Sequence, residues 1–431
     1  MPMLTTLSTL DLAGFRDRVA QRYEAFARRG LALDLTRGKP SSEQLDLSNA
    51  LLSLPGDDFH AADATDARNY GVLQGLPELR ALLAPLFGAD PSQVVIGGNS
   101  SLGLMHDAIV YALLSGVGGS SPPWSRESRI AFLCPVPGYD RHFAICHDFG
   151  IEMIPVALGA DGPDMDDVER LVAADPGIKG IWCVPKYSNP TGAVYSAATV
   201  ERLAAMTTAA PDFRVFWDNA YAVHHLTDER IEIASLIDAC ARHGHPHRPF
   251  VFGSTSKITL AGAGVSVFAS SRENVAWYLG RMGKRTIGAD KINQLRHVRF
   301  LGGTAGLLAL MDRHRAIVAP KFATVLERFG RDLAGTGVAS WIEPRGGYFV
   351  SLDVLDGCAR KVVTLARAAG IALTPAGATH PDGHDPHDRT VRIAPTYPDR
   401  GEVAAAAEGV AVCVLLAATT ALLEARTAQA R

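Results

Sequence analysis

FRVFWDNAYAVHH, residues 213–225, begins with a short apolar run that ends at Asp218 and then continues into a more polar stretch. A run of this length between polar boundaries is typical of a buried strand. Further runs of the same kind lie between residues 93 and 270, namely QVVIGG (93–98), RIAFLCP (129–135), GIEMIPVAL (150–158), GIWCVP (180–185), PFVFGS (249–254) and VSVFAS (265–270). Longer segments with helical spacing separate most of them, so the sequence predicts an α/β protein with a mostly parallel sheet.

The segments that flank this region have a different pattern. Residues 9–30 place apolar side chains at helical spacing and stop at Gly30, and beyond residue 303 a long helical stretch leads to further strands and a last helix. A chain of 431 residues also exceeds the usual size of one hydrophobic core. We expect an N-terminal segment, 1–55, that packs on a small α+β domain, 311–431, and a large domain over 56–310.

The composition is that of a soluble globular enzyme. Apolar residues make up 47% and charged residues 20% of the chain, and the formal net charge is −3 with no basic stripe for nucleic acid. The first thirty residues lack the apolar core of a secretory signal, and the apolar stretch 403–423 contains Glu408 and many alanines, which favours a helix over a bilayer span. We expect a cytoplasmic protein with reduced, buried cysteines that binds neither nucleic acid nor a membrane.

One lysine stands in an unusual setting. GSTSKITLAG, residues 253–262, places Lys257 among small hydroxyl and glycine residues directly after an apolar run. A semi-buried setting lowers the pKa of a lysine ammonium and leaves a neutral amine that can attack a carbonyl. The alternative is a surface lysine on a turn after a strand, and this motif alone leaves both open.

Two further motifs lie at strand ends, where α/β sheets bind their ligands. Asp218 has a carboxylate suited to keep a pyridine nitrogen protonated, and a helix-capping role is its alternative. Asn189 lies in VPKYSNPTGAVYS (184–196), and its side-chain amide can donate to a phenolate oxygen, although Asn-Pro-Thr-Gly is also a favourable turn sequence. Each motif alone fits a structural role as well as a chemical one.

Together the motifs N-P-T-G (189–192), D-x-x-Y (218–221) and S-x-S-K (254–257), in this order and at these separations, resemble the fold-type I aminotransferases of class I/II over nearly the whole chain. The resemblance implies the cofactor pyridoxal 5′-phosphate, a large domain with a mostly parallel sheet flanked by helices, and a smaller α+β domain. It also implies that Lys257 forms the Schiff base and shuttles the substrate proton, that Asp218 pairs with the pyridine nitrogen, and that Asn189 and Tyr221 hydrogen-bond the cofactor O3′. Tyr139 matches the aromatic residue that stacks on the ring.

The phosphate of the cofactor needs hydrogen-bond donors, and GGNSSLGLMHDA (97–108) supplies a glycine-rich turn that runs into a helix. The resemblance implies that the donors include the hydroxyls of Ser100, Ser101, Ser254 and Ser256. Tyr70 matches a tyrosine that reaches the phosphate of the neighbouring subunit, which implies a homodimer with shared active sites. The family usually has an arginine shortly after the Schiff-base lysine, whereas this chain has none between Lys257 and Arg272.

For the substrate, the resemblance assigns the α-carboxylate to Arg392 and further substrate contacts to Asn189. A narrower likeness, to bacterial aspartate aminotransferases of subgroup Ic, implies amino transfer between L-aspartate and 2-oxoglutarate. A distal carboxylate then needs a second cation, for which Arg141 is the first candidate and Arg37 the second. Gly38 lets its loop approach the substrate closely.

Other functions stay open at this point. The same fold hosts aminotransferases for aromatic, alanine or kynurenine-type substrates, lyases and decarboxylases, and non-catalytic ligand-sensing domains. A nicotinamide-dependent dehydrogenase is disfavoured because no G-x-G-x-x-G follows an early strand. The histidine-rich stretches 243–249 and 380–388 lack fixed helical spacing, so we expect no metal site.

Overall fold

The structure is a computed structural model that describes residues 2–118 and 122–429. Its contacts divide the chain into two compact units. The larger unit comprises Glu43–Ser188 and Ala193–Arg315, and the smaller one comprises Met1–Ser42, Asn189–Gly192 and Ala316–Arg431. Relative to the boundaries expected from the sequence, residues 43–55 and 311–315 group with the larger unit, and the short loop Asn189–Gly192 groups with the smaller one.

The larger unit is built on one eight-stranded sheet with the order β2-β9-β8-β7-β6-β3-β4-β5. Its strands are β2 (Val94–Gly97), β3 (Ala131–Val136), β4 (Glu152–Gly159), β5 (Gly162–Pro163), β6 (Ile178–Cys183), β7 (Arg214–Asp218), β8 (Pro249–Ser254) and β9 (Ser266–Ala269). The neighbouring strands β4, β3, β6, β7 and β8, in their order across the sheet, all run parallel. This mostly parallel sheet confirms the expected fold class.

Strand β9 runs antiparallel to both of its neighbours, β8 and β2. The connection from β8 to β9, residues 255–265, is shorter than the dozen or so residues that a parallel crossover needs. The chain therefore turns back beside β8 instead of crossing the sheet. Lys257 lies in this tight connection.

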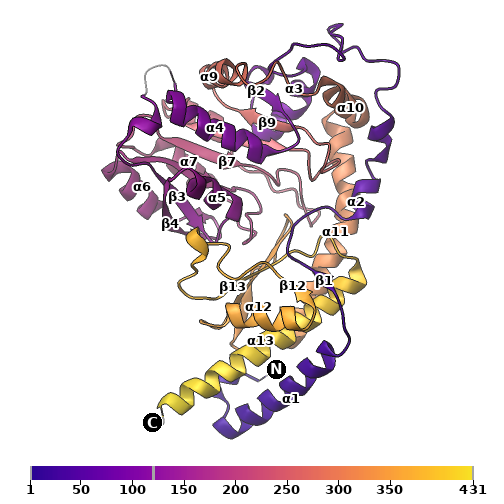
Figure 1. Cartoon of the computed structure of the whole chain (residues 1–431), viewed down its shortest axis with the longest axis vertical. Helices are drawn as coiled ribbons and strands as arrows, with labels where there is room; N and C mark the ends of the chain where they lie inside the picture. The colour runs from indigo at the N-terminus through magenta and orange to yellow at the C-terminus, as the bar shows by residue number, and fades with distance from the viewer. Residues whose placement is uncertain (1, 119–121, 430–431) are drawn as a thin grey trace. The chain divides into compact units, whose positions relative to one another are not determined.

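Helices cover both faces of the sheet (Figure 1). One face packs against α4 (Ser101–Ser115), α5 (Asp140–Asp148) and α9 (Arg272–Met282). The other face packs against α3 (Pro77–Leu83), α6 (Met165–Ala174), α7 (Ala197–Ala205), α8 (Leu236–Arg242) and α10 (Lys291–Leu301). The unit also contains α2 (Ser42–Asp46) and the 3-10 turns η2 (Asn49–Ser53), η3 (Ala84–Phe87), η4 (Pro91–Gln93) and η5 (Trp124–Arg126).

Side chains alternate between these two faces along each strand. In β7, Val215 and Trp217 belong to the core beneath α6–α8, whereas Phe216 belongs to the core beneath α4 and α5. Because the period of a strand is two, the residues that end β7 also alternate. The side chain of Asp218 therefore points to the same face of the sheet as that of Phe216. The side chain of Asn219 points to the opposite face, as that of Trp217 does.

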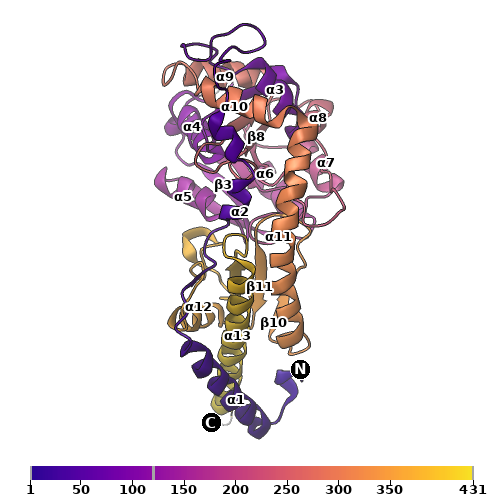
Figure 2. The same ribbon diagram turned by 90° about the vertical axis from the view of Figure 1, so that its right-hand side faces the viewer.

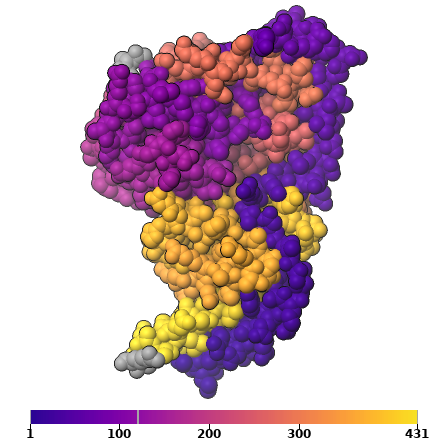
Figure 3. Space-filling model, in the orientation of Figure 1, coloured from indigo at the N-terminus to yellow at the C-terminus, as the bar shows by residue number. Residues whose placement is uncertain are grey.

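The smaller unit combines a three-stranded antiparallel sheet with long helices. The sheet has the order β10-β11-β13, with β10 (Ala339–Trp341), β11 (Val350–Val354) and β13 (Thr390–Ile393), and a parallel pair joins β1 (Leu33–Asp34) to β12 (Ile371–Ala372). The helices are α1 (Thr9–Ala27), α12 (Ala359–Ala368) and α13 (Arg400–Gln429), with most of α11 (Thr304–Asp332) and the turns η1 (Leu4–Thr6) and η6 (Pro381–Gly383). Figures 2 and 3 show α1 beside α13.

Helix α13 is long and apolar enough to span a membrane by length and composition alone. In the structure, however, 67% of its most apolar window is buried. It packs against α1 and α12 within the smaller unit. These contacts are those of a core helix, whereas the sequence predicted an amphipathic one.

Candidate active site

Lys257 lies in the turn after β8, with its ammonium nitrogen Nζ 5.1 Å from the centre of the Tyr221 ring. Burial lowers the pKa of the Lys257 ammonium, and the Asp218 carboxylate opposes this shift. The lowered pKa increases the share of neutral amine, which is the nucleophilic form. The structure thus provides the setting that the sequence predicted for this lysine.

A buried network of hydrogen bonds fixes the turn that carries Lys257. His297 Nδ1 donates to the backbone carbonyl of Asn293 at 2.8 Å, so its Nε2 is the acceptor in the neutral ring. This Nε2 lies 3.1 Å from the hydroxyl of Thr255 and 2.9 Å from that of Thr259. On the other side, His224 Nε2 donates to the backbone carbonyl of Lys257 at 3.2 Å. The lysine is therefore held through its backbone on both sides.

Asp218 ends β7 and is 3% exposed. His142 Nε2 donates to its Oδ2 at 3.2 Å. The His142 ring is itself stacked on Trp182, with 4.4 Å between ring centres, and meets Tyr139 edge-on at 5.0 Å. The carboxylate is thus fixed by a ring that α5 and β6 hold in place.

The other oxygen of Asp218, Oδ1, is buried and has no hydrogen-bond partner among the described residues. A buried polar atom without a partner costs free energy, of the order of 1–3 kcal/mol. An N–H donor such as a protonated pyridine nitrogen would satisfy it. This unpaired oxygen, on the same unit as Lys257, fits the cofactor that the sequence predicts.

Two of the four expected phosphate donors, Ser100 and Ser256, lie where the Lys257 turn meets the start of α4. Ser100 is the N-cap residue of α4 and makes no side-chain capping hydrogen bond, so its hydroxyl is not used to cap the helix. Ser256 donates to the backbone carbonyl of Asn99, and Asn99 Nδ2 donates to the carbonyl of Ala261 at 3.4 Å. The backbone N–H groups at the start of a helix attract anions. Ser101 opens the helix, and Ser254 is the last residue of β8.

The turn after Lys257, which lacks an arginine before Arg272, is closely packed at Gly264. A Cβ at Gly264 would lie 3.0 Å from the backbone nitrogen of Ser256. Asn293 also donates to the carbonyls of Ala263 and Gly264, at 2.9 and 3.0 Å. Residue 264 thus packs directly against the backbone of Ser256, and a long side chain at residue 264 would disrupt the turn.

Within the smaller unit, Asn189 and Arg392 form a buried pair. Asn189 is 4% and Arg392 7% exposed, and Arg392 Nη1 donates to Asn189 Oδ1 at 3.3 Å. Arg392 Nε and Nη2 also lie 3.3 and 3.2 Å from the hydroxyl of Thr374. The structure thus brings together two residues, 203 positions apart, for which the sequence predicts substrate contacts.

Gly38 packs against the same group. A Cβ at this position would lie 2.5 Å from Cζ of Phe349, and the guanidinium carbon of Arg392 lies 5.1 Å from the centre of the Phe349 ring. Glycine is therefore required here by contact with a ring of the protein. The sequence had attributed it to contact with substrate, and that contact stays a prediction.

The remaining predicted residues lie at the surface. Arg141, the second residue of α5, and Arg37, in the loop before Gly38, are exposed, and Tyr70 is 82% exposed. Their roles toward a distal carboxylate and a second subunit stay predictions. Within residues 2–118 and 122–429, no group of three or more histidine, cysteine, aspartate or glutamate side chains is placed to hold a metal ion.

Sequence reasoning missed the supporting histidines His142, His224 and His297. His142 and His297 are single residues in helices with no motif around them, and His224 lies just after the D-x-x-Y motif without being part of it. The signal that could have identified His142 is its position in the helix that follows Tyr139, next to a strand end where ligands gather.

Comparisons with known proteins place this geometry in a family. A profile described as aspartate amino-transferase matches residues 7–426. A protein of Mycolicibacterium smegmatis is 55% identical over 96% of this chain and 97% of its own length. An aspartate aminotransferase of Corynebacterium glutamicum is 52% identical over 94% of each chain. The crystal structure of an aspartate transaminase from Corynebacterium glutamicum superimposes with a TM-score of 0.95 and 50% identity, covering 97% of this chain and 99% of the other.

Proposed function

Because the chain belongs to the aspartate aminotransferase family of fold-type I pyridoxal-phosphate enzymes, we propose that it transfers the amino group between L-aspartate and 2-oxoglutarate. The family match, over residues 7–426, spans all of the predicted motifs. The observation that carries the proposal is the buried Asp218 carboxylate, fixed by His142 through one oxygen and unpaired at the other.

Pyridoxal phosphate, when bound, supplies an electrophilic carbonyl and a pyridinium ring that withdraws electrons from the substrate α-carbon. Asp218 would hold the proton on the pyridine nitrogen through its unpaired Oδ1. Asn189 and Tyr221 would hydrogen-bond the O3′ oxygen, and Tyr139 would lie against the ring. Ser100, Ser101, Ser254 and Ser256, with the N–H groups that begin α4, would hold the phosphate.

Lys257 has two roles in this proposal. Its amine, which burial makes less basic, would attach the cofactor covalently and would then move a proton from the substrate α-carbon as a general base. The hydrogen bonds of His224 and of the His297 network keep its backbone in place. A fixed backbone limits the positions that the amine can reach.

Substrate recognition is assigned to arginines. Arg392 is buried and presents a planar guanidinium, which matches the α-carboxylate in a bidentate arrangement. Arg141, or failing that Arg37, would contact the distal carboxylate that aspartate and 2-oxoglutarate share. A cation for the distal group is what would separate these substrates from alanine or aromatic amino acids.

The cellular context is part of the same proposal. The exposed Tyr70 ring supports a homodimer in which each chain completes the phosphate site of the other. All six cysteines are buried and none forms a disulfide, which supports a reducing, cytoplasmic setting.

Steady-state assays test the proposed reaction. L-aspartate, L-alanine, L-phenylalanine and L-kynurenine should be compared as donors with 2-oxoglutarate as acceptor. We expect kcat/KM for aspartate to exceed that for alanine by at least about thirtyfold, because only aspartate can use the second cation. A higher kcat/KM for any of the other three donors would contradict the assigned substrate.

A further inference from the structure

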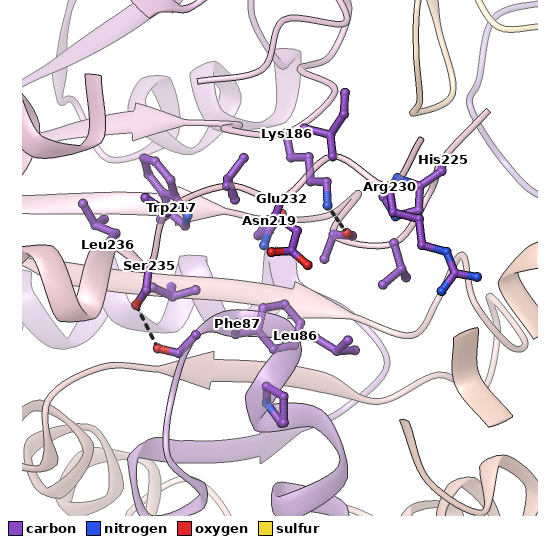
Figure 4. Close-up of a pocket in the computed structure, with 18 of the residues that line it drawn as sticks. Leu86, Phe87, Lys186, Trp217, Asn219, His225, Arg230, Glu232, Ser235 and Leu236 are labelled. Atoms are coloured by element: carbon purple, nitrogen blue, oxygen red, sulfur yellow. Dashed lines mark hydrogen bonds between the residues drawn. The ribbon is translucent and has the colours of Figure 1, made fainter. Parts of the chain in front are cut away.

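A cavity lies in the larger unit (Figure 4). Trp217 and Asn219 line it, so it lies on the face of the sheet opposite to Asp218. Its volume is about 400 Å³, which is within the usual range for small-molecule sites. Its walls come from β7, from the segment that leads into α8, and from η3 and the start of α11. Trp217 and Asn219 reach it because they alternate with Asp218 along the strand.

Two buried polar side chains line this cavity. Lys186 is 6% exposed, and its Nζ donates to the backbone carbonyl of Ala222 at 2.6 Å. Asn219 is also 6% exposed, and its Oδ1 is buried without a hydrogen-bond partner among the described residues. A buried ammonium with hydrogen atoms left to donate and a buried amide oxygen with nothing to accept both favour a polar ligand.

The neighbouring charges restrict what that ligand can be. The carboxylate of Glu232 and the ammonium of Lys186 point into the same space in Figure 4. Arg230 is engaged with Asp312 at 2.7 Å, and the ring of His225 lies 2.7 Å from the Tyr187 hydroxyl through its Nδ1. Burial lowers the pKa of His225 to about 4, so its ring is neutral. The charges available to a ligand are therefore one positive and one negative.

The remaining lining is largely apolar. Phe87, Trp217, Leu236 and Leu308 contribute to it, with side chains that are buried or half-buried. A simple anion would be repelled by Glu232, and a simple cation would be repelled by Lys186. A molecule with both charges and an apolar group matches every part of the lining.

We propose that this cavity binds a free α-amino acid with an aliphatic side chain, as the zwitterion. Its carboxylate pairs with Lys186, its ammonium donates to Asn219 Oδ1 and to Glu232, and its side chain lies against the apolar wall. This site is separate from the place where Lys257 reacts, and only the use of maleate in its test rests on the proposed dicarboxylate substrates.

Equilibrium dialysis of the holoenzyme against radiolabelled L-leucine, L-valine and L-methionine tests this. Saturating maleate, an unreactive dicarboxylate, is included to fill the substrate site. We expect saturable binding of one molecule per chain for at least one of the three. No saturable binding of any of them, or binding that maleate abolishes, would overturn the proposal.

Two analogues of leucine test the recognition of both charges. 4-Methylpentanoate lacks the ammonium group, and isopentylamine lacks the carboxylate. Each should bind at least about tenfold more weakly than leucine, because one charged hydrogen-bonding partner is lost. If either analogue binds as tightly as the amino acid, the site does not recognise a zwitterion.

Variants locate the binding in this cavity. Lys186→Met and Glu232→Gln should each weaken binding about tenfold or more, while Lys284→Met, at an exposed position on the other face, should leave it unchanged. Glu232 is exposed, so we expect Glu232→Gln to fold, and this variant still tests the proposal if Lys186→Met is unstable. Unchanged binding in either cavity variant would place the amino acid elsewhere.

Discussion

His142 and Asp218 are 76 residues apart, yet Nε2 of His142 lies 3.2 Å from Oδ2 of Asp218 and leaves Oδ1 unpaired. Because the ring is stacked on Trp182, it holds the carboxylate in one orientation. The unpaired oxygen can then accept a hydrogen bond from a bound cofactor. The proposed cofactor role of Asp218 rests on this arrangement.

Asp218→Asn removes the charge and keeps the size of the side chain. A neutral amide cannot stabilise a protonated pyridine nitrogen, so we expect cofactor affinity to fall about tenfold to a hundredfold and kcat/KM to fall at least about a hundredfold. Cofactor titration and steady-state kinetics measure the two effects. Asp148→Asn, at the exposed end of α5, should match the wild type. Wild-type kinetics in Asp218→Asn would rule out its role.

Arg141→Ala tests the recognition of the distal carboxylate. Loss of a desolvated arginine–carboxylate contact costs about 2–4 kcal/mol, so the preference for aspartate over alanine in kcat/KM should shrink at least about thirtyfold. Arg170→Ala, on the surface of α6, is the control. If the preference is unchanged in Arg141→Ala and lost in Arg37→Ala, the second candidate performs this role.

Gly38→Ala tests the packing beside Arg392. The added methyl would lie 2.5 Å from the Phe349 ring, so we expect the free energy of unfolding to fall by about 1–3 kcal/mol. Gly280→Ala, in α9, has no atom within 4 Å of the added methyl and should be neutral or stabilising. Denaturant unfolding of both variants measures the difference, and equal stability of the two would contradict the close contact.

The buried ammonium of Lys186 predicts a pH dependence of stability. Burial lowers its pKa to about 8 in the folded state from the usual 10.5. Between these values this lysine binds more protons in the unfolded chain than in the folded one, so its own contribution to stability rises with pH in this window. The gain relative to Lys186→Met is at most about 3 kcal/mol between pH 8 and pH 10.5.

Unfolding curves of the wild type, Lys186→Met and the control Lys284→Met across this window measure the effect. The curves of the wild type and Lys284→Met should run in parallel, and the stability of both should increase relative to that of Lys186→Met as the pH rises. Parallel curves for all three proteins would show that the pKa of Lys186 is not lowered.

The sheet was predictable because its strands are continuous apolar runs, and the Lys257 turn was predictable because its small residues interrupt that pattern. The partners of these residues were not. His142 meets Asp218 only because β3 and β7 flank β6 in the sheet, an order that no local pattern encodes. The sequence could have predicted that Asn219 points to the other face of the sheet, since side chains alternate along β7 and Asn219 follows Asp218 directly.

The most direct test of the central claim is the absorbance spectrum of the purified protein and of Lys257→Ala. The wild type should show the visible band of a covalently bound cofactor, which L-aspartate bleaches and 2-oxoglutarate restores. Lys257→Ala, supplied with pyridoxal phosphate, should lack that cycle. A wild-type protein without the band after addition of pyridoxal phosphate, or a Lys257→Ala variant that completes the cycle, would contradict the assignment of Lys257.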